Sequence, residues 1–202
     1  MDAQGWDERY AAGELVWSAG PNQFVEEALA DLPPGRAVDL AAGEGRNAIW
    51  LARRGWQVTA VDFSRIGLEK GRRVAGDVEI EWVCADATTW SAPEPVDLVV
   101  IAYLQLPAAE RAAAVRHGFD ALRPGGTFFL VAHDSTNIAE GSGGPQDPSV
   151  LYTAGDVLAD LDGRDVEVVR AERVTRVVTA EDGHGGEERR TALDALVHLH
   201  RR

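Results

Sequence analysis

Cysteine is nearly absent from this sequence. Cys84 is the only one among the 202 residues, so the chain can form neither an intramolecular disulfide nor a zinc site of several cysteines. Such scarcity is typical of proteins in a reducing compartment, and we expect a cytoplasmic protein. The apolar run around Cys84 predicts that its side chain is a small, buried part of the core.

Long apolar runs and an excess of positive charge are also lacking. No segment approaches the roughly 20 apolar residues of a membrane span, and residues 1–10 do not resemble a secretory signal. The formal net charge of −13 would repel nucleic acids and anionic membrane surfaces. We therefore expect a small-molecule partner, no nucleic acid and no membrane, with the acidity serving mainly solubility.

The size and composition are those of one globular unit. The chain has 202 residues, of which 45% are hydrophobic and 26% charged, and this balance is typical of a single soluble domain. We expect one domain over residues 1–202. Within it, residues 1–32 are predicted to form a helical cover and residues 33–202 an α/β core.

Strand-like and helix-like segments alternate through most of the chain. Short apolar runs predict strands at 37–40, 57–61, 78–84, 97–102 and 127–132. Helical spacing and capping residues predict helices at 2–12, after Pro21, at 47–54 and 64–75, from Pro107 and at 153–161. Repeated strand–helix units form doubly wound, mostly parallel sheets of the Rossmann-like α/β class, whose ligands bind at the carboxyl ends of the strands.

The last third of the chain has a different pattern. The strand-like runs 166–178 and 191–200 are joined by the polar, glycine-rich residues 181–188, which predicts a C-terminal antiparallel hairpin. Pro124-Gly125-Gly126 is expected to be a turn before the fifth strand. Residues 133–150 are rich in Gly, Pro, Asn and Asp, and we expect a long loop that lines the acceptor pocket and moves on binding. An exposed connection without a function is the alternative.

A glycine turn follows the first predicted strand, in the sequence Asp39-Leu40-Ala41-Ala42-Gly43-Glu44-Gly45-Arg46-Asn47. Glycines let the backbone turn sharply and let a ligand approach the N–H groups at the start of a helix. Together with Ala48, the two glycines fit the dinucleotide pattern G-x-G-x-x-A. The segment also fits a second pattern, in which an acidic residue, here Asp39, stands four positions before the first glycine.

Two further carboxylates follow the second and third strands. Asp62 is placed to accept hydrogen bonds from both hydroxyls of a ribose, a feature that nicotinamide and S-adenosylmethionine sites share. Phe63 beside it is expected to pack on an adenine or on the core. Asp86 follows the third strand, and for this residue a loop cap is the alternative to a ligand-binding role. Because the carboxyl ends of parallel strands meet at one edge, Asp39, Asp62 and Asp86 are predicted to lie along the same edge of the sheet.

These residues together resemble class I methyltransferases that depend on S-adenosylmethionine (SAM). The resemblance extends to Leu122-Arg123-Pro124-Gly125-Gly126 and to the C-terminal hairpin, and it covers residues 31–202. Ala41 departs from it, because the family commonly has its first glycine there. The resemblance implies SAM as cofactor, Asp86 as the partner of the adenine amino group, and methyl transfer to a small-molecule nucleophile. The cofactor-binding residues it implies are Trp17, Asp39, Ala41, Gly43, Gly45, Arg46, Asn47, Asp62, Phe63, Asp86, Ala87 and Ala102.

A subgroup is also suggested. The G-x-G-R-N of Gly43–Asn47 and the segment Tyr103-Leu104-Gln105-Leu106-Pro107 resemble small methyltransferases related to tellurite-resistance proteins and thiopurine methyltransferases. Trp6, Tyr10 and Trp17 resemble the N-terminal cover of that subgroup. By this resemblance, Trp17 and Arg46 lie near the methionyl end of SAM or the substrate. For Trp6 and Tyr10 we prefer packing of a helix face on the core.

The candidate catalytic residues are His133 and Tyr103, which follow the fifth and fourth predicted strands. A thiol or an oxyanion attacks an activated methyl group with little help, whereas an alcohol or an ammonium group needs a base. His117, and His184, His198 and His200 in a loop and a predicted edge strand, show no metal-ligand spacing, so no metal is expected. Two other functions fit the glycine turn and Asp62 in part. They are an NAD-dependent oxidoreductase and a SAM-binding protein without catalysis.

Overall fold

The computed structural model describes residues 3–12, 20–181 and 187–202, and over these it has seven strands in one sheet. The strands are β1 (Arg36–Leu40), β2 (Gln57–Asp62), β3 (Glu81–Cys84), β4 (Val96–Ala102), β5 (Leu122–His133), β6 (Val166–Glu181) and β7 (Glu187–Arg201). Their spatial order is β3-β2-β1-β4-β5-β7-β6. The first five are parallel, and β7 runs antiparallel to both β5 and β6. The predicted α/β class, mostly parallel sheet and C-terminal hairpin are confirmed.

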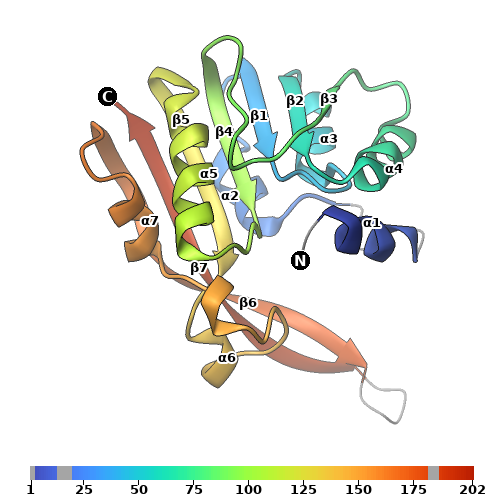
Figure 1. The fold of residues 1–202 in the computed structure, drawn as a ribbon, viewed down its shortest axis with the longest axis vertical. Helices are drawn as coiled ribbons and strands as arrows, with labels where there is room; N and C mark the ends of the chain where they lie inside the picture. Colours follow the sequence, from blue (N-terminus) through green and yellow to red (C-terminus); the bar gives the residue numbers. More distant parts are fainter. Residues whose placement is uncertain (1–2, 13–19, 182–186) are drawn as a thin grey trace.

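Helices cover both faces of the sheet (Figure 1). The helices are α1 (Ala3–Ala11), α2 (Gln23–Leu29), α3 (Arg46–Arg53), α4 (Arg65–Ala75), α5 (Ala108–Asp120), α6 (Asn137–Glu140) and α7 (Ala154–Asp160), with a 3₁₀ turn at Pro148–Val150. Alternate residues along the strands point to opposite faces of the sheet and form two hydrophobic cores. One packs residues such as Val38 and Val99 against α5 and α7, and the other packs Val58 and Leu98 against α2 and α3. None of the described helices is long and apolar enough to cross a membrane.

Helix boundaries follow the capping residues of the sequence. The Ser64 hydroxyl accepts the Gly67 N–H at the start of α4. Thr153 and Asp156 form a reciprocal capping box at the start of α7, as the sequence predicts. Each bond satisfies a backbone donor that the first turn of a helix leaves unpaired.

The strands differ from the expected ranges at three places. β3 begins at Glu81 rather than at residue 78. β5 begins at Leu122, so Pro124-Gly125-Gly126 is a bulge within it rather than a turn before it. The pairing with β4 shifts from Val96↔Leu122 to Leu98↔Thr127, and Gly125 has a φ of 80°. The extra residues of β5 loop out of the ladder, and glycine tolerates the left-handed backbone that this requires.

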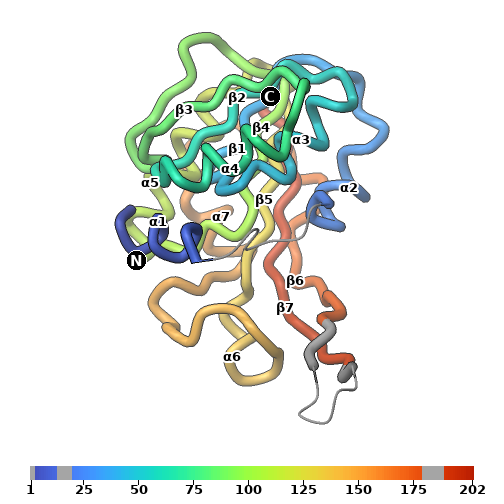
Figure 2. Tube along the Cα trace, turned by 90° about the vertical axis from the view of Figure 1, so that its right-hand side faces the viewer, coloured from blue at the N-terminus to red at the C-terminus, as the bar shows by residue number. Residues whose placement is uncertain are grey.

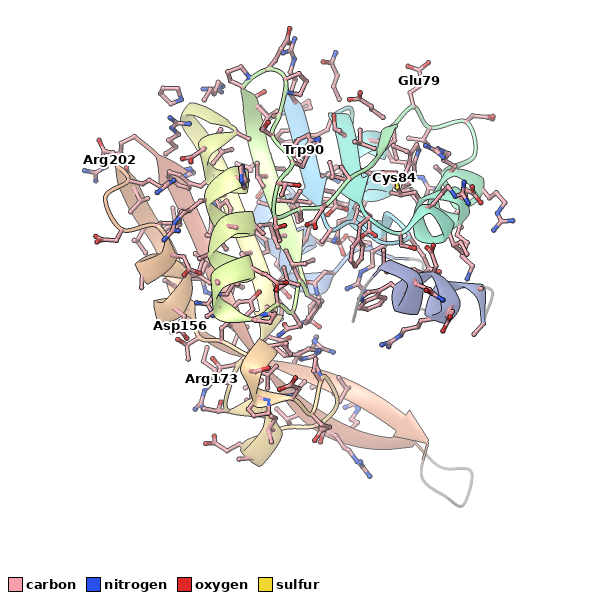
Figure 3. All side chains as sticks on the ribbon, in the orientation of Figure 1. Glu79, Cys84, Trp90, Asp156, Arg173 and Arg202 are labelled. Carbon is pink, nitrogen blue, oxygen red and sulfur yellow. The ribbon has the colours of Figure 1, made fainter. Side chains whose placement is uncertain are left out.

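Two predictions about exposure are wrong. Cys84 is exposed rather than buried, because it is the last residue of β3 at the edge of the described sheet (Figure 3). The strand that carries His198 and His200 is interior rather than an edge, because β7 lies between β5 and β6. A hairpin pattern in the sequence does not reveal which of its two strands pairs with the rest of the sheet. His184 lies outside the described residues.

The β6–β7 hairpin projects beyond the parallel strands (Figures 1 and 2). β7 pairs with β5 only from Asp194 to His200, and its residues 187–193 pair with β6 alone. The predicted loop at residues 133–150 is more ordered than expected, since it contains α6 and the 3₁₀ turn. Asn137 fixes it to the hairpin, because the Leu193 N–H donates to Asn137 Oδ1 at 2.7 Å.

Candidate functional site

The turn between β1 and α3 is built from left-handed residues. Ala41, Gly43 and Gly45 have φ values of 64°, 56° and 71°. A non-glycine residue in this region costs roughly 1–2 kcal/mol, so Ala41 is strained at the position where the resembling family commonly has glycine. A side chain at Gly45 would in addition come within 2.5 Å of the Trp82 ring. The turn therefore needs glycine at residue 45 for space as well as for backbone conformation.

Asp39 lies directly beneath this turn. Its Oδ2 accepts the Ala48 N–H at 3.0 Å, while Oδ1 is buried without a hydrogen-bond partner among the described residues. Burial raises the pKa of Asp39 to about 7, against the lowering effects of the Ala48 N–H and the Arg46 charge. An unpaired buried acceptor is costly. Asp39 is thus prepared to accept a hydrogen bond from a donor that approaches the turn.

Asp62, at the end of β2, connects the glycine turn to the next helix. Its Oδ2 accepts the Gly43 N–H and its Oδ1 accepts the Ser64 N–H, both at 2.8 Å. Burial raises the pKa of Asp62, and the two backbone hydrogen bonds oppose that rise. Each carboxylate oxygen can accept a second hydrogen bond, so Asp62 can hold the turn and still receive hydroxyl donors. Phe63 is half-buried and belongs to neither core.

Asp86 follows β3 at the same edge, but it bonds locally. Its Oδ1 accepts the N–H and the hydroxyl of Thr88, each at 2.8 Å, which is the loop cap that the sequence left open as an alternative. Ala87 is buried and packs in the core with α5 and α7. Ala102, the last residue of β4, packs against the other core. The structure therefore brings Asp39, Asp62 and the glycine turn into contact, with Asp86 farther along the edge.

A second polar cluster forms around Asp194, in the middle of β7 and opposite the end of β5, with Tyr103 directly after β4. Its carboxylate is fully buried, with an exposed fraction of 0%. Asp194 Oδ2 accepts the Tyr103 hydroxyl at 2.8 Å and Arg176 Nε at 2.9 Å, and Oδ1 lies 3.3 Å from His133 Nδ1 without the alignment of a full hydrogen bond. Burial alone would raise the pKa of Asp194, but these contacts outweigh it and hold the pKa below its usual range.

Both candidate catalytic residues belong to this Asp194 cluster. The rings of Tyr103 and His133 are 4.8 Å apart. Tyr103 has a φ of 60°, a strained backbone of the kind that gathers at functional sites. Burial and the Asp194 carboxylate raise the pKa of Tyr103, which keeps its hydroxyl protonated. Gly144 packs on the face of His133, where a Cβ would come within 2.9 Å of the ring.

Asn22 and Arg46 connect the Asp194 cluster with the glycine turn. The Asn22 side chain caps α2 and donates from Nδ2 to the Tyr103 hydroxyl at 3.3 Å, and its N–H donates to Asn47 Oδ1 at 2.9 Å. The guanidinium of Arg46, the first residue of α3, lies 6.0 Å from the centre of the Tyr103 ring. Asn47 therefore has a structural role, while Arg46 stands between the two groups of polar residues.

Three of the residues at the site are not identified from the sequence alone. Asn22, Arg176 and Asp194 were not singled out, although a lone acid within the apolar run Ala192–Val197 is a usable signal. Tyr10 is buried, and its ring packs 5.5 Å from that of Trp6, as the packing interpretation expects. Trp17 lies outside the described residues. Among the described side chains no group of three or more metal-ligating residues gathers.

A separate hollow of about 750 Å³ opens at the other edge of the sheet. It is lined at the strand beginnings by residues that include Arg36, Gln57 and Glu81, and Arg36 is ion-paired there with Glu94. None of the polar residues of the glycine turn or the Asp194 cluster lines it. We therefore place the candidate site at the carboxyl ends of the strands.

Comparison with known proteins connects this geometry to a family. Residues 37–126, from β1 to the bulge in β5, match the family model described as "Methyltransferase domain". A demethylmenaquinone methyltransferase of Clavibacter sepedonicus is 39% identical over 127 residues, which are 60% of this chain and 52% of the relative. A trans-aconitate 2-methyltransferase of Streptomyces coelicolor is 31% identical over 137 residues, which are 63% of this chain and 45% of the relative. The chain thus spans about half the length of the curated relatives it matches.

Solved structures confirm the fold. TehB from Haemophilus influenzae superposes with a TM-score of 0.74 at 18% identity, over 90% of this chain and 63% of the other. The N-methyltransferase NodS from Bradyrhizobium japonicum WM9, in complex with S-adenosylhomocysteine, superposes with a TM-score of 0.71 at 17% identity, over 100% of this chain and 99% of the other. The chain therefore shares the fold of these two proteins.

Proposed function

We propose that this protein, whose residues 37–126 match a methyltransferase domain, transfers a methyl group from SAM to a small-molecule nucleophile. The observation that carries the proposal is the glycine turn, with Asp39 beneath it and Asp62 bonded to the Gly43 N–H. The turn lies at the carboxyl ends of parallel strands, where ligands of this architecture bind.

The residues present fit SAM. Asp39 Oδ1, which is buried and has no partner in the part of the chain that the structure describes, would accept a hydrogen bond from the methionyl ammonium group, and an ionised Asp39 would attract its charge. Asp62 would receive the ribose hydroxyls on its remaining lone pairs. Phe63 and Asp86 stand farther along the same edge for the adenine, and Ala41, Gly43, Gly45 and Arg46 would contact the methionyl part. When bound, SAM supplies a methyl group that is already activated for transfer.

The Asp194 cluster provides the acceptor side. Tyr103 is held protonated and donates to Asp194, so it would orient an acceptor rather than remove its proton. His133 is the candidate proton acceptor for an alcohol or ammonium substrate. The His133 Nδ1 atom is buried against Asp194. Because 14% of the side chain is nevertheless exposed, atoms of His133 other than Nδ1 are the ones that reach solvent. A thiol or an oxyanion would not need this base.

Two alternatives have less support. An NAD-dependent oxidoreductase accounts for the glycine turn and Asp62 but not for the antiparallel hairpin or the methyltransferase-domain match. A nucleic-acid acceptor is raised by a tRNA 5-carboxymethoxyuridine methyltransferase of Escherichia coli, 26% identical over 124 residues. The net charge of −13 favours a small acceptor.

The extent of the domain, its compartment and its subgroup are part of the same proposal. We propose a single SAM-binding domain over residues 1–202 in the cytoplasm, with residues 1–32 as a helical cover. In support of the cover, Tyr10 of α1 packs on α4, where a Cβ at Gly67 would come within 3.1 Å of its ring. The G-x-G-R-N segment and the fold shared with TehB support the small-methyltransferase subgroup.

Calorimetric titration tests the cofactor assignment. We expect SAM and S-adenosylhomocysteine to bind and NADH not to bind. Asp62→Ala should weaken S-adenosylhomocysteine at least tenfold, since a hydrogen bond to a charged group contributes roughly 1.5–3 kcal/mol. The exposed Asp77→Ala should leave affinity unchanged. Tighter binding of NADH than of S-adenosylhomocysteine would overturn the proposal.

A further inference from the structure

Two guanidinium groups lie close to the Tyr103 ring in the candidate site. Arg46 of α3 is 6.0 Å and Arg176 of β6 is 5.4 Å from the ring centre. They come from segments far apart in the sequence, the glycine turn and the projecting hairpin. Each guanidinium is partly buried, and burial and the Arg176 charge lower the pKa of Arg46. Like charges repel, and a bound anion near both guanidiniums reduces that repulsion.

Arg176 is held in place beside the Tyr103 ring. Its Nε is fixed by Asp194 Oδ2 at 2.9 Å, and its side chain is 20% exposed. Tyr103 also forms a side-chain hydrogen bond with this guanidinium, and the exposed fraction shows that the group still reaches solvent. A guanidinium anchored through Nε presents its two terminal N–H₂ groups as a fork, which matches the two oxygens of a carboxylate.

The local pattern of charge differs from that of the whole chain. The ionised Asp194 lies against Arg176, and Asp39, whose pKa is raised by burial to about 7, lies near Arg46. Two positive charges thus converge beside Tyr103 within a chain of net charge −13. A sulfonium cofactor adds to that positive charge. An anionic substrate group is thus attracted to this place and repelled by most of the remaining surface.

We propose that Arg176, anchored by Asp194 and with Arg46 also beside the Tyr103 ring, binds a carboxylate group of the methyl acceptor, so that the substrates are small carboxylic acids. This inference rests on the proposed function and names its substrate class. Asp194 is then a positioning residue, because it orients both Arg176 and the Tyr103 hydroxyl. The C-terminal hairpin contributes the specificity of the site, whereas the glycine turn contributes cofactor binding.

The test uses a panel of small mono-, di- and tricarboxylic acids, each matched with its neutral amide. Binding is followed by ligand-observed NMR titration on the full chain saturated with S-adenosylhomocysteine. We expect acids from the panel to bind and their amides not to bind. Arg176→Gln should weaken acid binding at least tenfold. Arg170→Gln, which removes the same charge from an exposed β6 residue ion-paired with Glu172, should stay within twofold of the wild type.

Arg176→Lys is the control for misfolding. It keeps a positive charge beside Asp194 but lacks the two terminal N–H₂ groups of the guanidinium. It should weaken acid binding at least threefold in a protein with wild-type thermal unfolding. Wild-type acid binding in either Arg176 variant, or no binding by any acid of the panel, overturns the inference while S-adenosylhomocysteine still binds. Failure of the wild type to bind S-adenosylhomocysteine overturns the proposed function instead.

The methionyl part of the cofactor also has a carboxylate. A second titration shows whether Arg176 binds the carboxylate of the acceptor or that of the cofactor. 5′-Methylthioadenosine lacks the methionyl carboxylate and ammonium group. We expect Arg176→Gln to bind S-adenosylhomocysteine and 5′-methylthioadenosine within twofold of the wild type. A tenfold loss for S-adenosylhomocysteine alone would assign Arg176 to the cofactor and overturn its role in acceptor binding.

Discussion

Asp39 shows how burial can turn one carboxyl group into a pH-dependent part of a site. It is 1% exposed, with one oxygen bonded to the Ala48 N–H and the other without a partner over residues 3–12, 20–181 and 187–202. Its pKa of about 7 lies above that of an unfolded aspartate. The native state therefore binds more protons than the unfolded state between about pH 4 and pH 7, and the contribution of Asp39 to stability falls as the pH rises through that window.

The first prediction concerns the cofactor and this ionisation. A methionyl ammonium group favours the ionised Asp39, so affinity for S-adenosylhomocysteine should rise from pH 6 to pH 8. Asp39→Asn should remove most of this rise, because an amide does not titrate. Calorimetry across this pH range measures both proteins. A wild-type affinity that does not change with pH would show that Asp39 does not pair with the ammonium group.

The second prediction concerns the strained alanine of the glycine turn. Ala41 has a φ of 64°, so Ala41→Gly should raise the free energy of unfolding by about 1 kcal/mol, after allowance for the greater freedom of glycine in the unfolded chain. Ala42→Gly is the matched control and should lower it, because Ala42 is outside the left-handed region. Chemical denaturation gives both values. Equal destabilisation by the two substitutions would contradict the strain at Ala41.

At the scale of elements, one buried residue anchors the segment between β5 and the 3₁₀ turn, which Arg173 also contacts at Thr136 and Glu140. Asn137 is 2% exposed, accepts the Leu193 N–H at 2.7 Å and donates to the Gly143 carbonyl at 2.8 Å. Its side chain therefore joins α6 to β7 on one side and to residues 141–144 on the other. Gly144 in turn covers His133.

The third prediction follows from that anchor. Asn137→Ala leaves the N–H of the buried Leu193 without its side-chain acceptor, at a cost of roughly 1–3 kcal/mol, and this should free the covering segment locally. Limited proteolysis should cut faster within residues 138–147, while the exposed Ser135→Ala stays at the wild-type rate. If both variants are cut equally, Asn137 is not the residue that holds the segment.

The sequence predicts the regular elements better than the contacts between distant ones. Asp39, Gly43 and Asp62 were found because strand ends and glycine turns are local patterns that parallel topology brings to one edge. Asp194 and Arg176 were not found, because their roles depend on the pairing of β7 with β5 and on a bond across the hairpin. The Cys84 prediction was wrong for the same reason, since apolar neighbours do not reveal which strand ends at an edge.

On the scale of the whole molecule, charge is distributed unevenly. The chain carries a net charge of −13, while Arg46 and Arg176 converge at the candidate acceptor site. The overall charge and the local pair of guanidiniums then act on different kinds of ligand. The overall field disfavours polyanions, and the local pair favours a compact anion that reaches between the two guanidiniums.

The fourth prediction tests the overall field. We expect no binding of a transfer RNA at physiological ionic strength, because a polyanion is repelled by the net charge. Fluorescence anisotropy with a labelled transfer RNA between 50 mM and 200 mM salt makes the measurement. Affinity that falls steeply as salt increases would reveal counterion release, and with it a basic surface that binds nucleic acid.

The order of the last two strands has a consequence for how the protein is assembled during synthesis. β6 is made before β7, yet it reaches the sheet only through β7. While the ribosome is still adding β7, the side of β5 away from β4 has no partner strand and β6 has none at all. Exposed strand edges of this kind invite pairing with other chains. The nascent protein is therefore vulnerable to aggregation just before β7 emerges, and β7 also delivers Asp194.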